Sequence, residues 1–304
     1  MKKTLIALAV LSATSAFAQV TMTGVVRAGF QKSNATANPT GLALTDVTVN
    51  LAAAEDLGGG MKASTGVTFD QSSGSFGNAL NRRNTNVQLQ GGFGLVRFDQ
   101  TRSTDLITRA WVAPSNLDQG IYDGSGIVNR GAVDVLTYGM AFGPVTASIQ
   151  YAEAGTAGTA TPTLTTTVLN VGYANGPLAA GFAIKNGSGA ATATFARTVN
   201  NEAFVTYDFG VAKVGLGWDG AAAAASSAVN DASAVAFGVS VPVTSALTLG
   251  ANYASRDVNN TSEFAANYAL SKRTVFNASY GRQTAKENAT TTADQFRISL
   301  AHNF

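Results

Sequence analysis

Hydrophobic and polar residues alternate one by one along most of the chain. The alternation recurs in segments near 20–30, 46–53, 145–151, 178–185, 213–219, 247–254 and 296–304. Successive side chains of a β-strand point to opposite faces of a sheet, so this period predicts strands with one apolar and one polar face. We find no apolar stripe of helical period beyond residue 18. The sequence therefore predicts an all-β protein.

The segments that connect the predicted strands are of two kinds. Short turns are expected near 55–60, 91–94, 143–144, 175–177, 210, 242–245 and 270–273. Longer connections are expected near 31–43, 71–80, 102–130, 153–164, 186–198, 220–232, 256–261 and 285–292. Seven short turns and eight longer connections join sixteen strands, and the spacing leaves room for strands of about 9–11 residues, the length that crosses a membrane when tilted.

Two architectures can use these strands. A soluble sandwich or propeller packs its apolar faces inward, whereas a membrane barrel turns them toward lipid and keeps a wet interior. The polar faces carry mostly Thr, Ser, Asn, Gln and Gly, which suits a lumen better than a charged exterior. Aromatic residues recur beside the short turns and at the chain end, as an interfacial girdle requires: Phe142, Tyr173, Phe209, Tyr268 and Phe304. The pattern favours a transmembrane, 16-stranded antiparallel β-barrel with short periplasmic turns and longer outer loops.

The first 18 residues have the features of a cleaved export signal. Lys2 and Lys3 precede a short apolar run, Leu5 to Leu11, and Ala16-Phe17-Ala18 is a small-residue cleavage site. We expect residues 1–18 to be a signal peptide and residues 19–304 to form one barrel in the outer membrane.

Composition narrows the possible functions. Charged residues make up 12% of the chain, about half the usual share, and there is no cysteine and one histidine. Of the 20 basic residues two lie in the signal, so the remaining 18 balance the 18 acidic ones and give no case for nucleic-acid binding. We expect no catalytic, cofactor or metal site, because such sites need partners that His302 lacks. A passive channel, a barrel enzyme and an adhesive barrel are separated by a conductance measurement.

Several motifs resemble those of the Gram-negative general porins, most of all the β-proteobacterial ones. These motifs are Glu55-Asp56-Leu57-Gly58-Gly59-Gly60-Met61-Lys62-Ala63, Arg82-Arg83, Asn175-Gly176-Pro177-Leu178, Leu270-Ser271-Lys272-Arg273-Thr274 and the terminal His302-Asn303-Phe304. The resemblance implies a homotrimeric, water-filled diffusion channel for small hydrophilic solutes. It also implies that the connection near 102–130, called loop 3 here, folds into the pore. Expected partners are outer-membrane lipid, lipopolysaccharide and the assembly machinery, for which Phe304 is the expected signal.

Strand parity assigns charged residues to the lumen. It places Arg27, Lys62, Arg82, Arg97, Lys213 and Arg297 inward, together with Asp46, Asp70, Asp99 and Asp208. Parity does not resolve Asp134, which needs a bulge or a rim position. Any one of these charges can equally be a solvated residue without a role.

We expect the constriction to be formed by wall residues that face acidic residues of loop 3. The wall candidates are Arg27, Arg82, Arg97, Asp99 and Arg130, and the loop candidates are Asp105, Asp118 and Asp123. Alternatively, loop 3 packs on the barrel rim or against a neighbouring subunit. Wall arginines predict a weak preference for anions, which Thr48 weakens because related porins commonly carry arginine there.

Overall fold

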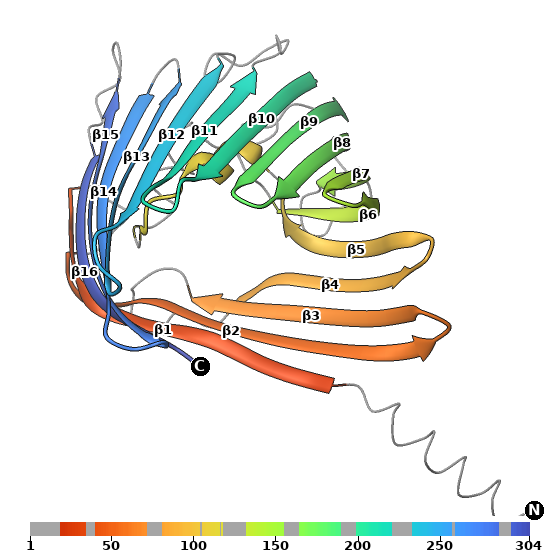
Figure 1. Ribbon diagram of the computed structural model, residues 1–304, viewed down its shortest axis with the longest axis horizontal. Helices are drawn as coiled ribbons and strands as arrows, with labels where there is room; N and C mark the ends of the chain where they lie inside the picture. Colours follow the sequence, from red (N-terminus) through yellow and green to blue (C-terminus); the bar gives the residue numbers. More distant parts are fainter. Residues whose placement is uncertain are drawn as a thin grey trace, which may run out of the picture.

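The computed structural model shows one closed barrel of antiparallel strands (Figure 1). It describes residues 19–34, 40–71, 81–103, 105–115, 117, 132–154, 164–189, 199–220, 233–256, 259–285 and 293–304. The first eight strands are β1 (Gln19–Ser33), β2 (Gly41–Gly58), β3 (Met61–Gln71), β4 (Asn81–Gly91), β5 (Gly94–Arg102), β6 (Ala132–Phe142), β7 (Val145–Ala154) and β8 (Leu164–Asn175). The others are β9 (Leu178–Gly189), β10 (Val199–Asp208), β11 (Lys213–Gly220), β12 (Ala234–Pro242), β13 (Leu247–Arg256), β14 (Asn259–Ala269), β15 (Thr274–Ala285) and β16 (Ala293–Asn303).

Each strand pairs with its neighbours in the sequence, and β1 pairs with β16 to close the sheet. The predicted sixteen strands and seven short turns are confirmed. At the closure, the backbone N–H of Gly24 donates to the carbonyl of Phe304 and the N–H of Phe304 donates to that of Gly24, each at 3.0 Å. Closure leaves no unpaired sheet edge. A β-sheet inside lipid requires this, because lipid cannot hydrogen-bond to free backbone groups.

The distribution of apolar and polar side chains over the two faces of the wall is the reverse of that in a soluble protein. Large apolar side chains such as Leu216, Trp218 and Phe264 are exposed on the outside. Glu202, Asp219 and other polar side chains are buried on the inside. Lipid can cover the apolar side chains, whereas Glu202 and Asp219 form ion pairs with cations inside the barrel. In the part of the chain that is described, no helix has the length and hydropathy that a membrane span requires.

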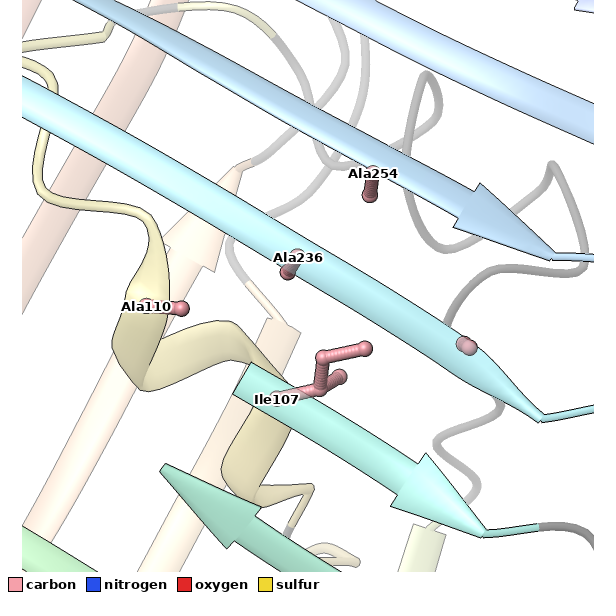
Figure 2. Packing of buried hydrophobic residues seen from close by; sticks show 5 residues of the cluster. Ile107, Ala110, Ala236 and Ala254 are labelled. Carbon is pink, nitrogen blue, oxygen red and sulfur yellow. The ribbon is translucent and has the colours of Figure 1, made fainter. Parts of the chain in front are cut away.

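A short 3-10 helix, η1 (Leu106–Ala110), follows β5 and lies inside the barrel against β10, β11 and β12 (Figure 1). Its Ile107 and Ala110 pack on Ala236 and Ala254 of the wall, as Figure 2 shows. The described part of loop 3 is therefore folded into the pore as predicted.

Candidate functional site

Glycines in the wall make the seat for η1 and the residues that follow it. A Cβ atom added to Gly215 or Gly238 would lie 2.4 or 2.2 Å from the carbonyl oxygen of Ala110. At Gly250 it would lie 2.6 Å from Cδ of Pro114. Real Cβ atoms essentially never approach another heavy atom within 3.0 Å, so only glycine lets the loop lie directly on the sheet.

Polar residues of the wall then fix the path of the loop. The backbone N–H of Ala113 donates to Oδ1 of Asn252 at 3.1 Å, and the hydroxyl of Ser115 donates to the buried carboxylate of Glu263. Asn252 also donates to Glu263, at 3.1 Å. Loop 3 thus crosses the lumen side of β11 to β14 along defined hydrogen bonds.

The beginning of loop 3 is held by a buried cluster of charged residues, called the root cluster here. It consists of Asp105, Lys185, Glu202, Asp219 and Arg256, from loop 3 and strands β9, β10, β11 and β13. Glu202 accepts from the backbone N–H of Leu106 at 2.8 Å and forms an ion pair with Lys185. Asp219 forms an ion pair with Arg256. The carboxylate of Asp105 accepts from the N–H of Ile107 at 3.2 Å, which caps η1.

The root cluster carries three carboxylates and two cations. Oxygen atoms of Asp105, Glu202 and Asp219 lie within 4.8 Å of one another, the one such grouping among the described residues. Because Lys185 and Arg256 balance two of the three, a single negative charge is left over, which one proton neutralises. Burial first, and then the charge of Glu202, raise the pKa of the Asp105 carboxyl to about 8.

Ion pairs also line the wall formed by β1 to β5. Arg27 Nη1 lies 3.2 Å from Asp46 Oδ2, and Thr48 donates to the same carboxylate at 2.8 Å. Arg97 Nε donates to Asp99 Oδ1 at 2.6 Å. Of the predicted constriction residues, Arg27, Arg97 and Asp99 therefore face the lumen, and each is paired with a residue of the wall.

Arg83 occupies the lumen position that was expected for Arg82. The register between β3 and β4 shifts at Thr68 and Phe69, so that Arg82 lies opposite Phe69. Arg83 lies 3.3 Å from Asp70 on the lumen side. Arg82 is exposed and lines an outer hollow of about 590 Å³ together with Val87, Phe98, Leu136 and Tyr151, which face lipid. The assignment of Arg82 to the lumen was wrong, because the bulge adds one residue and reverses parity there.

Asp105 also differs from its expected place. The sequence suggested that it opposes wall arginines across the pore, but only 7% of it is exposed and it belongs to the root cluster. Asp118, Asp123 and Arg130 lie outside the described residues. Asp134 lies at the outer end of β6 on the outer face, where Gln100 donates to it at 3.1 Å, a rim position. His302 is exposed at the turn side, 3.0 Å from the hydroxyl of Thr274.

Sequence reasoning missed the root cluster. Its members come from five separate segments, and the hydrogen bond from Leu106 to Glu202 joins residues 96 positions apart. A usable signal was present, however. The lumen positions of β11 to β13 carry a run of very small residues: Gly215, Gly217, Ala234, Ala236, Gly238, Gly250 and Ala254. Such a run marks where another backbone lies close to a sheet.

Comparisons with known proteins agree with this architecture. The profile of the Gram-negative porin family matches residues 4–288. Among solved structures, an anion-selective porin from Comamonas acidovorans is 22% identical, with a TM-score of 0.69, over 95% of this chain and 100% of the other. The trimer form of OmpT, an outer membrane protein of Vibrio cholerae, is 14% identical, with a TM-score of 0.71, over 94% and 99%.

A variant of the Rh. blastica porin is 12% identical, with a TM-score of 0.66, over 94% of this chain and 100% of the other. No curated protein matches the chain. At these identities the solved structures support the fold of the barrel alone.

Proposed function

The chain belongs to the Gram-negative porin family, and from that premise we propose that it is a passive channel with a weak preference for anions. Porins are outer-membrane channel proteins rather than enzymes. The observation that carries the proposal is the inverted wall, apolar outside and polar inside, closed around a lumen that loop 3 narrows. The Comamonas acidovorans protein of the same fold is an anion-selective porin, which supports the sign of the preference.

The preference is weak because arginines of the β1 to β5 wall are paired. Arg27, Arg83 and Arg97 each lie against an aspartate, so each pair presents little net charge to a passing ion. Salt limits the reach of any single charge to about 8–10 Å under physiological conditions. The preference therefore falls as salt rises. The reversal potential of the wild type across a KCl gradient tests it; a cation-preferring channel at low salt contradicts it.

We further propose a homotrimer. The outward faces of β1 and β16 expose Val26, Phe30 and Leu300, an apolar surface that either lipid or a second copy covers. The related OmpT structure is a trimer form, which supports the same assembly here. Native mass spectrometry in several mild detergents tests it. Trimers are expected in each, and monomers throughout would contradict the proposal.

Export and assembly complete the proposal. Residues 1–18 act as a cleaved signal peptide, and the described barrel begins at Gln19. The mature barrel then contacts outer-membrane lipid, lipopolysaccharide and the assembly machinery, with Phe304 as the assembly signal. Amino-terminal sequencing of the membrane-extracted protein is expected to read from Gln19, and a chain that retains Met1 would contradict cleavage.

A further inference from the structure

Most cations that the structure places inside the barrel already have a partner. Arg27, Arg83 and Arg97 are paired with aspartates of the wall. Lys185 and Arg256 belong to the root cluster. Arg297 is almost fully buried and donates to Gln31 at 2.7 Å.

Arg109 is different from these residues. It is the fourth residue of η1, its side chain is exposed, and no carboxylate of the described chain forms an ion pair with it. Ile107 and Ala110 turn toward the wall (Figure 2). With three residues per turn, a side chain between those two positions points to a different side of the helix. Because η1 lies inside the barrel, the exposed guanidinium meets the water of the pore.

We propose that Arg109 is the residue that chiefly sets the preference of the channel for anions. This inference rests on the proposed channel function and names the charge responsible. A charge with no opposite charge beside it acts on an ion as a monopole, whereas an arginine beside an aspartate acts as a dipole whose field decays faster with distance. Among the residues that the structure describes, no carboxylate lies in ion-pair contact with Arg109. Arg109 also stands on the inward-folded segment, nearer the solute path than the wall, within the reach that salt allows.

The position of Arg109 is fixed on both sides. Asp105 caps η1 at its start, and the glycines of β11 and β12 receive Ala110 at its end. The backbone that carries the Arg109 side chain is therefore held firmly against the wall, as a group that determines selectivity requires. Lys213 offers a matched comparison, since it too is exposed, inward by parity and without a described ion-pair partner. It begins β11, beside a short turn at the barrel end, rather than on the loop inside.

Reversal potentials across a KCl gradient test the inference on the full-length channel. Arg109→Gln is expected to remove most of the anion preference, Arg109→Lys to retain it, and Lys213→Gln to change it little. If the wild type prefers anions and Arg109→Gln leaves the reversal potential unchanged, this inference is overturned while the proposed function stands. If the wild type prefers cations, the proposed selectivity fails, but Arg109→Gln must still move the potential further toward cations.

Because the chain has no native cysteine, a second experiment can compare two charges on one and the same assembled variant. Arg109→Cys is labelled in the inserted channel with a methanethiosulfonate carrying either a trimethylammonium or a sulfonate group. The cationic label is expected to restore the anion preference and the anionic label to reverse it. Identical reversal potentials after the two labels, with labelling verified by mass, would overturn the inference.

Discussion

Single residues show where parity along a strand stops being a reliable guide. It correctly faced Arg97 and Asp99 inward, because the pairing of β5 with both neighbours is uninterrupted there. It also holds for Arg27, since the register shift just after this residue adds its extra residue, Thr45, to β2 rather than to β1. It failed at Arg82, where one extra residue in β4 exchanges the roles of two adjacent arginines. A bulge leaves no mark in a pattern of alternating residues, so this error could not be avoided from the sequence.

The two adjacent arginines provide a prediction with its own control. Arg83→Ala leaves Asp70 without its partner in the lumen, so the reversal potential is expected to shift toward cations. Arg82→Ala removes a charge from the outer face and is expected to leave the potential unchanged. The contrary outcome, a shift with Arg82→Ala alone, would mean that Arg82 is the lumen residue.

Asp105 predicts a dependence on pH. Its pKa is raised on burial from 3.8 to about 8, so the docked loop binds more protons than an undocked one between these values. Protonation of Asp105 therefore stabilises the docked loop. This stabilisation is fully present below the ordinary pKa of the carboxyl and is lost as pH rises through the raised pKa of the docked state. The groups that face Asp105 are Lys185 on β9, Glu202 on β10, Asp219 on β11 and Arg256 on β13, while the facing residues of β12 are apolar.

Single-channel current noise measures this effect. The wild type is expected to show little current noise at about pH 6 and more at about pH 9, because loop 3 is held less firmly at the higher pH. Asp105→Asn keeps a neutral group of the same shape, and its noise is expected not to change over this range. Asp134→Asn, at the exposed rim, serves as the control. Equal pH dependence in wild type and Asp105→Asn would contradict the role of the root cluster.

At the scale of elements, sequence reasoning worked where a single physical rule decides the outcome. Alternation fixes a strand whose faces meet lipid and water, and a glycine-rich or proline-containing break fixes a turn, so all sixteen strands were located. The seat of η1 was missed because it depends on which strands lie opposite loop 3 once the barrel closes. The position at which loop 3 packs is marked by small residues on β11, β12 and β13, and no single one of these residues is unusual.

The seat makes a prediction about packing. Gly238→Val places a branched side chain where even one Cβ lies 2.2 Å from the Ala110 carbonyl. Either the strand or η1 must move, at a cost of about 1–3 kcal/mol for overpacking. We expect a lower unfolding temperature and a larger single-channel conductance, because the loop leaves the pore. Gly139→Ala is the control, since its nearest added contact is an ordinary 3.5 Å; unchanged conductance in Gly238→Val would argue against the seat.

For the whole molecule, the pairing of β1 with β16 closes the barrel. Phe304 exchanges two backbone hydrogen bonds with Gly24, and its ring occupies the space where a Cβ of residue 24 would be, 2.5 Å from Cζ. Deletion of Phe304 removes both bonds and the ring together. A lower fraction of heat-modifiable protein on gels is expected, and Phe304→Tyr should restore it. Normal assembly of the deletion variant would remove this role.

The barrel and its strand number could be predicted from the whole sequence because both depend on a repeated signal, and the family could be predicted because several separate motifs agree. The sequence also predicts a weak preference for anions, but it could not show which of the charged residues are paired, because pairing is set by contacts between distant segments. We propose that this closed barrel conducts ions passively with a weak preference for anions. Purified wild-type protein in a planar bilayer under a KCl gradient tests it most directly. We expect stepwise, ohmic conductance with a reversal potential displaced modestly toward that of chloride. A trace without conductance steps, or a displacement toward potassium, is incompatible with a passive, anion-preferring channel.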